Sequence, residues 1–82
     1  MERIEVKSSA LRAIAYDAAT QTLEVVFPPT RSGVCVVWRY EPVPQSLVDQ
    51  MLAEGASVGT VFHRAIKTSP LIEARRVGEE PA

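Results

Sequence analysis

Prolines interrupt this chain at three places and limit it to short segments of secondary structure. Pro28 and Pro29 cannot donate the backbone hydrogen bonds of a central strand. Pro42 and Pro44 end a second extended run, and Pro70 ends the last helical pattern. In a chain of 82 residues these breaks leave room for one small domain, because a second core would have too few residues to close.

Three segments before Pro42 have the patterns of strands. Residues 22–27 alternate apolar and polar side chains, which places one apolar set on a single face. Residues 10–17 end at a turn, and residues 34–40 are rich in β-branched and aromatic side chains. Gly33 provides the positive φ that a hairpin return to the last segment needs. We therefore predict three strands over these ranges.

Two helices are predicted after these strands. The first spans residues 44–54 and stops at Gly55. The second begins at Ser57, which caps it, and carries one apolar stripe. The stripe consists of Val58, Val61, Phe62, Ala65 and Ile66. The order of three strands followed by two helices predicts an α+β fold, in which a three-stranded antiparallel sheet carries both helices on one face.

A three-stranded sheet covered on one side has a second face without a covering layer. Val26, Cys35 and Val37 are expected on it, as an apolar surface that is exposed or buried against a partner. This surface predicts self-association as a homodimer through the sheet. Residues 78–82 are too polar and short to pack strongly, so we expect a flexible tail.

The charges are distributed unevenly along the chain. The formal net charge of -1 excludes the whole-molecule positive field of a strongly basic nucleic-acid binder. Residues 56–78 nevertheless carry a local surplus of +3. His63, Arg64 and Lys67 lie on the polar side of the second predicted helix, where they form a candidate phosphate-binding stripe. A solvated polar face explains the same residues, so both interpretations stay open.

Aromatic residues in the third predicted strand are the second candidate for nucleic-acid binding. Trp38 and Tyr40 are two positions apart and share a face, while Arg39 points to the other. An open pair of rings would form a stacking platform for unpaired bases. Packing in the core is the stronger alternative, because a small chain with few aromatic residues needs their volume.

Catalytic, metal and cofactor chemistry has little support in the composition. The single cysteine, Cys35, cannot form an intrachain disulfide, and the single histidine, His63, cannot build a zinc ligand set. We expect no enzyme activity, no metal and no cofactor. Ser57 and Gly59 at a helix start could bind an anion, but capping alone explains Ser57 and close packing explains Gly59, so this is the weaker interpretation.

The sequence has no apolar run of membrane-spanning length, and its first residues lack the basic-then-apolar order of a secretory signal. We therefore expect a cytoplasmic protein that does not bind membranes.

Several short motifs together resemble those of the KTSC domain family. They are Val6-Lys7-Ser8-Ser9, Ile14-Ala15-Tyr16-Asp17, Thr22-Leu23-Glu24-Val25-Val26-Phe27, Trp38-Arg39-Tyr40, Val43-Pro44, Ala56-Ser57-Val58-Gly59, Phe62 and Ile66-Lys67. The resemblance covers residues 3–69 and implies one domain over 1–82. The family occurs at the C-terminus of some lysyl-tRNA synthetases and as stand-alone bacterial proteins, with RNA binding as the suggested role.

The chain departs from the family pattern at a few positions. The family has a central Tyr-x-Tyr motif, whereas this chain has Trp38-Arg39-Tyr40. The connection between Pro28 and Val37 is longer than in the family, and His63 occupies a position where the family commonly has Asn. The resemblance and the local charge together predict a non-catalytic module that binds RNA, with tRNA as a candidate, through the basic helix and the Trp-x-Tyr strand. The alternative is a protein-interaction or self-assembly module that uses the uncovered sheet face.

Overall fold

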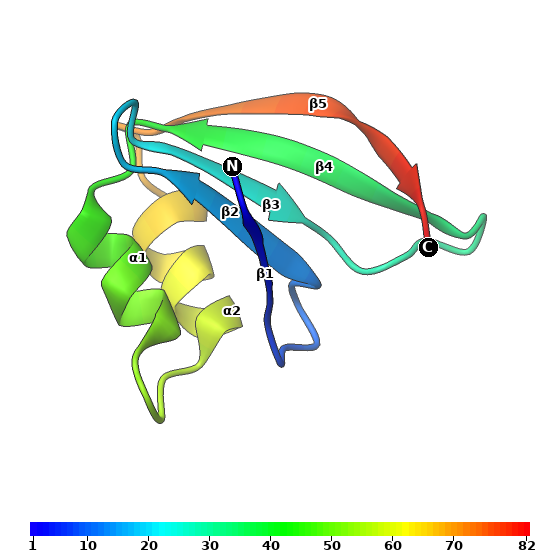
Figure 1. The fold of residues 1–82 in the computed structure, drawn as a ribbon, viewed down its shortest axis with the longest axis horizontal. Coiled ribbons are helices and arrows are strands. Elements are labelled where there is room, and N and C mark those ends of the chain that lie inside the picture. Colours follow the sequence, from blue (N-terminus) through cyan, green and yellow to red (C-terminus); the bar gives the residue numbers. More distant parts are fainter.

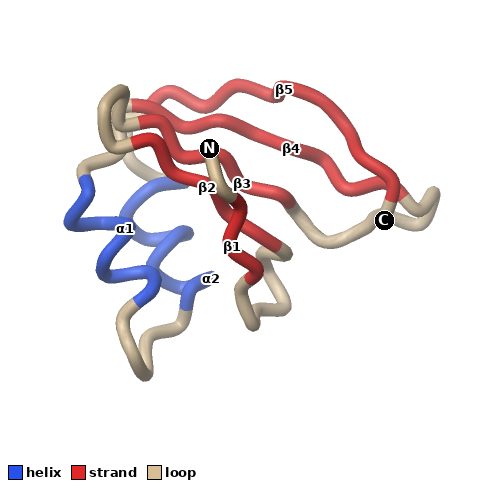
Figure 2. The backbone as a smooth tube through the Cα atoms, in the orientation of Figure 1, coloured by secondary structure: helices blue, strands red, loops and turns tan.

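A computed structural model describes residues 1–82 as a five-stranded antiparallel sheet with helices on one face (Figure 1). The strands lie in sequence order across the sheet, so neighbours in the chain are also neighbours in space. Helices come between the fourth and fifth strands. Figure 2 shows that the helical layer covers one end of the sheet, whereas the far ends of the last two strands extend beyond it.

The three predicted strands are present. They are β2 (Ala13–Asp17), β3 (Thr22–Val26) and β4 (Val34–Glu41). Gly33 adopts the positive φ of 80° expected for the return between β3 and β4. The α+β class is confirmed, together with the position of both helices on one face.

The prediction of three strands was wrong, because the sheet also has β1 (Arg3–Glu5) and β5 (Glu73–Pro81). Both are edge strands whose residues are mostly exposed, so neither has the apolar alternation by which strands are recognised. The segment 78–82, expected as a flexible tail, lies largely within β5. Ala82, the last residue, is also held to the sheet, because its N–H donates a hydrogen bond of 2.9 Å to the Gly33 carbonyl.

The helical region matches its prediction closely. Helix α1 spans Gln45–Leu52, and Gly55 follows it with a φ of 81°. Helix α2 (Val58–Val61) continues without a break into η1 (Phe62–Lys67), a stretch of π-helix. The Ser57 hydroxyl accepts a hydrogen bond from Thr60 N–H at 3.3 Å, which confirms the predicted cap. No helix is long and apolar enough to cross a membrane.

The main core lies between the sheet and the helices. Leu23 and Val25 of β3 pack there with Phe62 and Ile66 from η1, as the apolar stripe predicted. Tyr16 extends from β2 to the chain before α1, where its hydroxyl donates a hydrogen bond to the Val43 carbonyl at 2.5 Å. These contacts fix the positions of η1 and of the chain before α1 relative to the sheet.

The opposite face of the sheet is not the open apolar surface that three strands would leave. Val26, Cys35 and Val37 do lie on it, but only 3%, 1% and 4% of their surfaces are exposed. The expected uncovered face is therefore absent, and with it the observation on which the predicted dimer through this face rested.

Curvature of the sheet explains this burial. Arg3 of β1 forms a bidentate ion pair with Glu80 of β5, although β1 and β5 are the two edge strands of the sheet. Four strand spacings would separate flat edges by about 19 Å, more than the two side chains can span. The sheet must therefore curl, so the face away from the helices is concave and its edges approach each other over Val26, Cys35 and Val37.

Candidate nucleic-acid interface

The two aromatic residues of β4 occupy different environments, although both face the helices. Tyr40 is 5% exposed and its ring meets Phe62 edge-on, with centroids 5.2 Å apart. Burial raises the pKa of the Tyr40 hydroxyl above its ordinary value. Tyr40 is thus a core residue and does not present a ring face for stacking.

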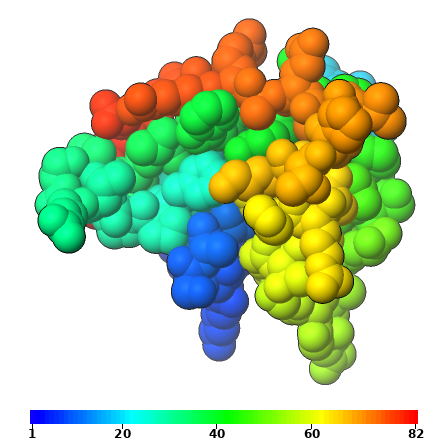
Figure 3. Space-filling model, turned by 180° about the vertical axis from the view of Figure 1, so that it is seen from behind, coloured from blue at the N-terminus to red at the C-terminus, as the bar shows by residue number.

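Trp38 lies at the margin of the core, where the helical layer ends. It packs against the core cluster but stays partly exposed. The surface beside it is hollowed into an apolar groove with a volume of about 430 Å³. The groove is lined by Phe27, Val36, Trp38, Tyr40, Lys67 and Ala74. Figure 3 shows η1 and the segment after it, coloured yellow to orange, against the green and cyan strands on this side of the molecule.

The basic residues of the second helix are exposed as predicted. Phe62 and Ile66 of η1 are buried, while His63, Arg64 and Lys67 face solvent. Lys67 also lines the groove beside Trp38, so the structure brings one predicted basic residue and one predicted aromatic residue together. Neither Arg64 nor Lys67 forms an ion pair within the chain.

A further cation near Trp38 comes from β5. Arg76 is the cross-strand partner of Trp38, so its side chain lies on the same face of the sheet. Its guanidinium is 3.3 Å from a carboxylate oxygen of Glu79, and both side chains are about half exposed. The sequence shows a basic surplus here, but the position of Arg76 depends on β5, whose mostly exposed residues carry no strand pattern.

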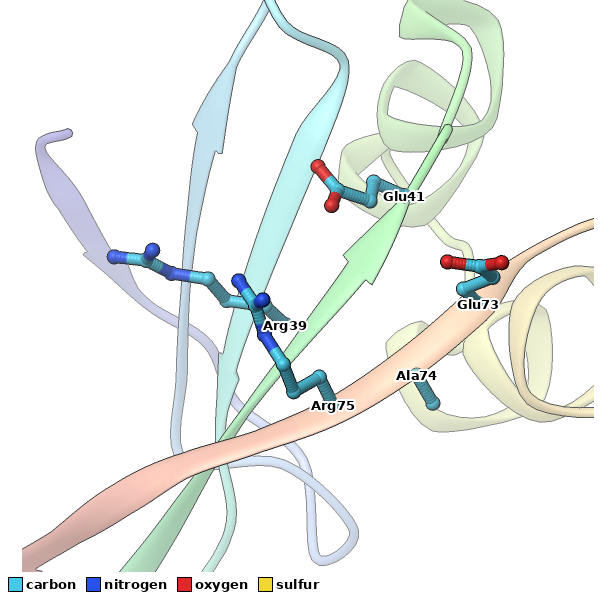
Figure 4. Close-up of a pocket in the computed structure, with 5 residues that line it drawn as sticks. All are labelled: Arg39, Glu41, Glu73, Ala74 and Arg75. Carbon is cyan, nitrogen blue, oxygen red and sulfur yellow. The ribbon is translucent and has the colours of Figure 1, made fainter.

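Arg39 belongs to a separate site on the concave face. Its Nε donates a hydrogen bond of 3.1 Å to Glu24, and its cross-strand partner on β5 is Arg75. Glu41 is paired with Glu73 in the same register. Arg39, Glu41, Glu73 and Arg75 line a hollow of about 370 Å³. Figure 4 shows how their side chains and that of Ala74 project from β4 and β5. Arg39 therefore does not extend the surface formed by Trp38 and Lys67.

Ser57 and Gly59, the two residues of the candidate anion site, both have structural roles at the start of α2. The Ser57 hydroxyl is used by the cap, and a side chain at Gly59 would place its Cβ 2.9 Å from the Cβ of Ala10. Gly59 therefore permits a close approach between α2 and the loop before β2. Ser8 of that loop accepts hydrogen bonds from Ala10 and Leu11 backbone N–H groups.

Cys35 has a basic neighbour that the sequence did not indicate. The Arg12 guanidinium, from the residue just before β2, donates to the Cys35 sulfur at 3.1 Å on the concave face. The thiol is almost fully buried. No group of three or more His, Cys, Asp or Glu side chains lies close enough to hold a metal ion.

Comparison with known proteins relates this arrangement to one family. The sequence model of the KTSC domain family matches residues 7–69 of this chain. An uncharacterized protein of Stutzerimonas stutzeri (strain A1501) is 42% identical over 67 residues, which are 82% of this chain and 86% of the relative. The crystal structure of a KTSC domain protein from Yersinia pestis is similar with a TM-score of 0.69 at 27% identity, covering 94% of this chain and 97% of that one.

Proposed function

This chain belongs to the KTSC domain family, and from that premise and the groove beside η1 we propose that it is a small binding module for single-stranded RNA. The observation that carries the proposal is the meeting of Trp38 and Lys67 in one apolar groove at the edge of the core. An aromatic ring beside a free cation matches the two parts of a nucleotide, its base and its phosphate.

The base would stack in the groove. Trp38 offers the largest ring of the chain, and Phe27 and Val36 supply further apolar surface around it. Stacking of this kind tolerates any base and contributes about 1–3 kcal/mol for each base. Because a base inside a duplex is covered by its neighbours, the groove favours unpaired nucleotides such as those in loops and at chain ends.

The phosphates would lie along the exposed side of η1. Lys67 is at the groove, Arg64 is three residues before it, and His63 is four residues before it, so all three lie within about one turn. Arg76 lies beside Trp38 on the neighbouring strand β5. This local surplus of positive charge is compatible with the net charge of -1, because acidic residues elsewhere in the chain balance it.

Fluorescence anisotropy with labelled single-stranded RNA, duplex RNA and tRNA tests the proposal. We expect the single strand to bind more tightly than the duplex. With about three phosphate contacts, raising the salt from ~50 to ~200 mM should weaken the single-strand complex about 20-fold. Absence of binding to both the single strand and tRNA at ~50 mM salt would overturn the proposal.

Charge reversal separates this surface from general electrostatic attraction. The double substitution Arg64→Glu with Lys67→Glu should abolish binding. Its matched control is Lys7→Glu with Arg31→Glu, which makes the same change in net charge at exposed positions that do not line the groove. Equal losses in the two variants would contradict a specific role for η1.

A further inference from the structure

Strand β5 forms one open edge of the sheet. It pairs with β4 on one side only, and it is the last strand in the sheet order. Its outward backbone N–H and C=O groups are therefore available to another strand. Charged residues commonly protect such an edge against uncontrolled pairing. In β5, however, the order of the charges also favours one particular pairing between two copies of the strand.

The charges of β5 reverse about the middle of the strand. Arg75 and Arg76 precede Val77 and Gly78, and two glutamates, Glu79 and Glu80, follow them. An antiparallel second copy centred between Val77 and Gly78 would place each arginine of one copy opposite a glutamate of the other. The pairs would be Arg75 with Glu80 and Arg76 with Glu79, and the symmetry would form each pair twice.

A bulge in β5 makes this alignment compatible with the two faces of the sheet. Residues 75 and 80 are five positions apart, so in a regular strand their side chains would lie on opposite faces. The register with β4 shifts here: Gly78 pairs with Val37, whereas Arg76 pairs with Trp38, and Val77 is left as the extra residue.

The shift brings each oppositely charged pair to one face. Glu80 is paired with Cys35 and Arg75 with Arg39, and both belong to the concave face. Glu79 and Arg76 are paired with residues of the helix-covered face, Val36 and Trp38. Opposite charges thus meet on the concave face and on the helix-covered face alike.

Other alignments of two copies are less favourable. A parallel pair in register would place arginine against arginine and glutamate against glutamate, which is destabilising. Moving the antiparallel centre by one residue toward the start of the strand places Glu73 against Glu80. Moving it by the same amount toward the end leaves both arginines without an acidic partner in the strand. The charge order therefore selects one register.

We propose that the protein forms a two-fold symmetric dimer in which the β5 edges of two copies pair antiparallel about Val77 and Gly78. The dimer would contain one continuous sheet of two five-stranded halves. Arg75 has no ion pair within the chain, and Arg76 and Glu79, which pair with each other, are 52% and 51% exposed. The side chain of Glu80 is 35% exposed and already pairs with Arg3, so in the dimer its carboxylate would be shared between Arg3 and Arg75 of the second copy. This interface lies along the β5 edge and does not require the buried cluster of the concave face, although it shares Arg76 with the surface proposed to bind RNA.

Analytical ultracentrifugation between ~10 µM and ~1 mM protein at low salt tests the proposal. The native chain should show a monomer–dimer equilibrium that weakens as salt is added, because its pairs are exposed. Arg76→Glu, which creates two repulsive pairs in the dimer, should weaken association by about tenfold or more. Glu79→Arg should do the same. Both positions are exposed, and far-ultraviolet circular dichroism checks that each variant is folded.

Complementation of the two variants provides the decisive result. When Arg76→Glu and Glu79→Arg are mixed, every glutamate of one chain faces an arginine of the other, so a mixed dimer should form. The double variant with both substitutions should again form a dimer by itself. A native chain that remains monomeric at ~1 mM and low salt would overturn the proposal. Single variants that associate as the native chain does, or a mixture that does not recover, would overturn it as well.

Discussion

The two faces of the sheet both bury apolar side chains, but different parts of the molecule cover them. On one face the helices cover large residues such as Leu23 and Val25. On the other face curvature and charged side chains cover a smaller cluster, which consists of Ala13, Val26, Cys35 and Val37. A concave surface leaves less volume to fill, so small side chains suffice there. A single layer can thus have two cores when it curls.

The largest effect should come from the core under the helices. Phe62→Ala removes the ring that meets both Tyr40 and Phe27 edge-on, and it should lower the free energy of unfolding by about 3–5 kcal/mol. Urea denaturation followed by circular dichroism measures the change. A loss below about 1 kcal/mol would mean that η1 is not packed on β4 as described.

The concave face should respond as a true core, with a smaller effect. Val37→Thr keeps the shape of the side chain but buries a hydroxyl, and it should cost about 1–3 kcal/mol. The control is Val77→Thr, at an exposed position of β5, which should change stability by less than about 0.5 kcal/mol. Equal small effects at both positions would show that the concave face is open to solvent.

The groove at the end of the helical layer should contribute more to binding than to folding. Trp38→Ala should reduce affinity for single-stranded RNA by about 1–3 kcal/mol, which corresponds to a factor of about 5–150. Anisotropy titration measures it. We expect its cost in stability to be smaller than that of Phe62→Ala, because Trp38 is only partly buried. Unchanged RNA affinity in the folded variant would contradict stacking in the groove.

The smallest effect should come from the ion pair that joins the two edges of the sheet. Arg3 and Glu80 are each more than one third exposed, so Glu80→Gln should cost only about 0.5–1 kcal/mol at neutral pH. Hydrogen bonding to Arg3 holds the pKa of the Glu80 carboxyl below its usual range.

The pH dependence of this effect has a defined sign. The pKa of the Glu80 carboxyl is lower in the folded state than in the unfolded state. The ion pair with Arg3 therefore stabilises the protein fully at pH values above the pKa that Glu80 has in the unfolded chain. That contribution is lost as the pH falls through the folded-state pKa. The difference in thermal unfolding between the native chain and Glu80→Gln should therefore be largest near neutral pH and shrink as the pH is lowered. A difference that grows on acidification would contradict the assignment.

Local pattern was sufficient for the elements that have a strong apolar period. Residues 22–27 alternate, and the stripe that includes Phe62 and Ile66 repeats at helical spacing, so both were found with nearly correct bounds. The exposure of His63, Arg64 and Lys67 followed from the same helical period. The edge strands were missed because their side chains are mostly exposed and carry no such period.

The candidate site was only partly accessible to pattern reasoning. Alternation along β4 separates Arg39 from Trp38 and Tyr40, as the structure confirms. It cannot say that Tyr40 lies under η1 whereas Trp38 lies at its margin, because that depends on where the helices end above the sheet. The position of Arg76 beside Trp38 likewise requires β5 to return along β4.

The amino-acid order alone therefore specifies the α+β class, the helices and the uneven charge, since each depends on residues close together in the chain. The curl of the sheet depends instead on contacts between distant residues. Arg3 and Glu80 are 77 positions apart, and their pairing closes the concave face over Val26, Cys35 and Val37. A periodicity of two places those residues on one face, but the bending of the whole sheet determines whether that face meets water.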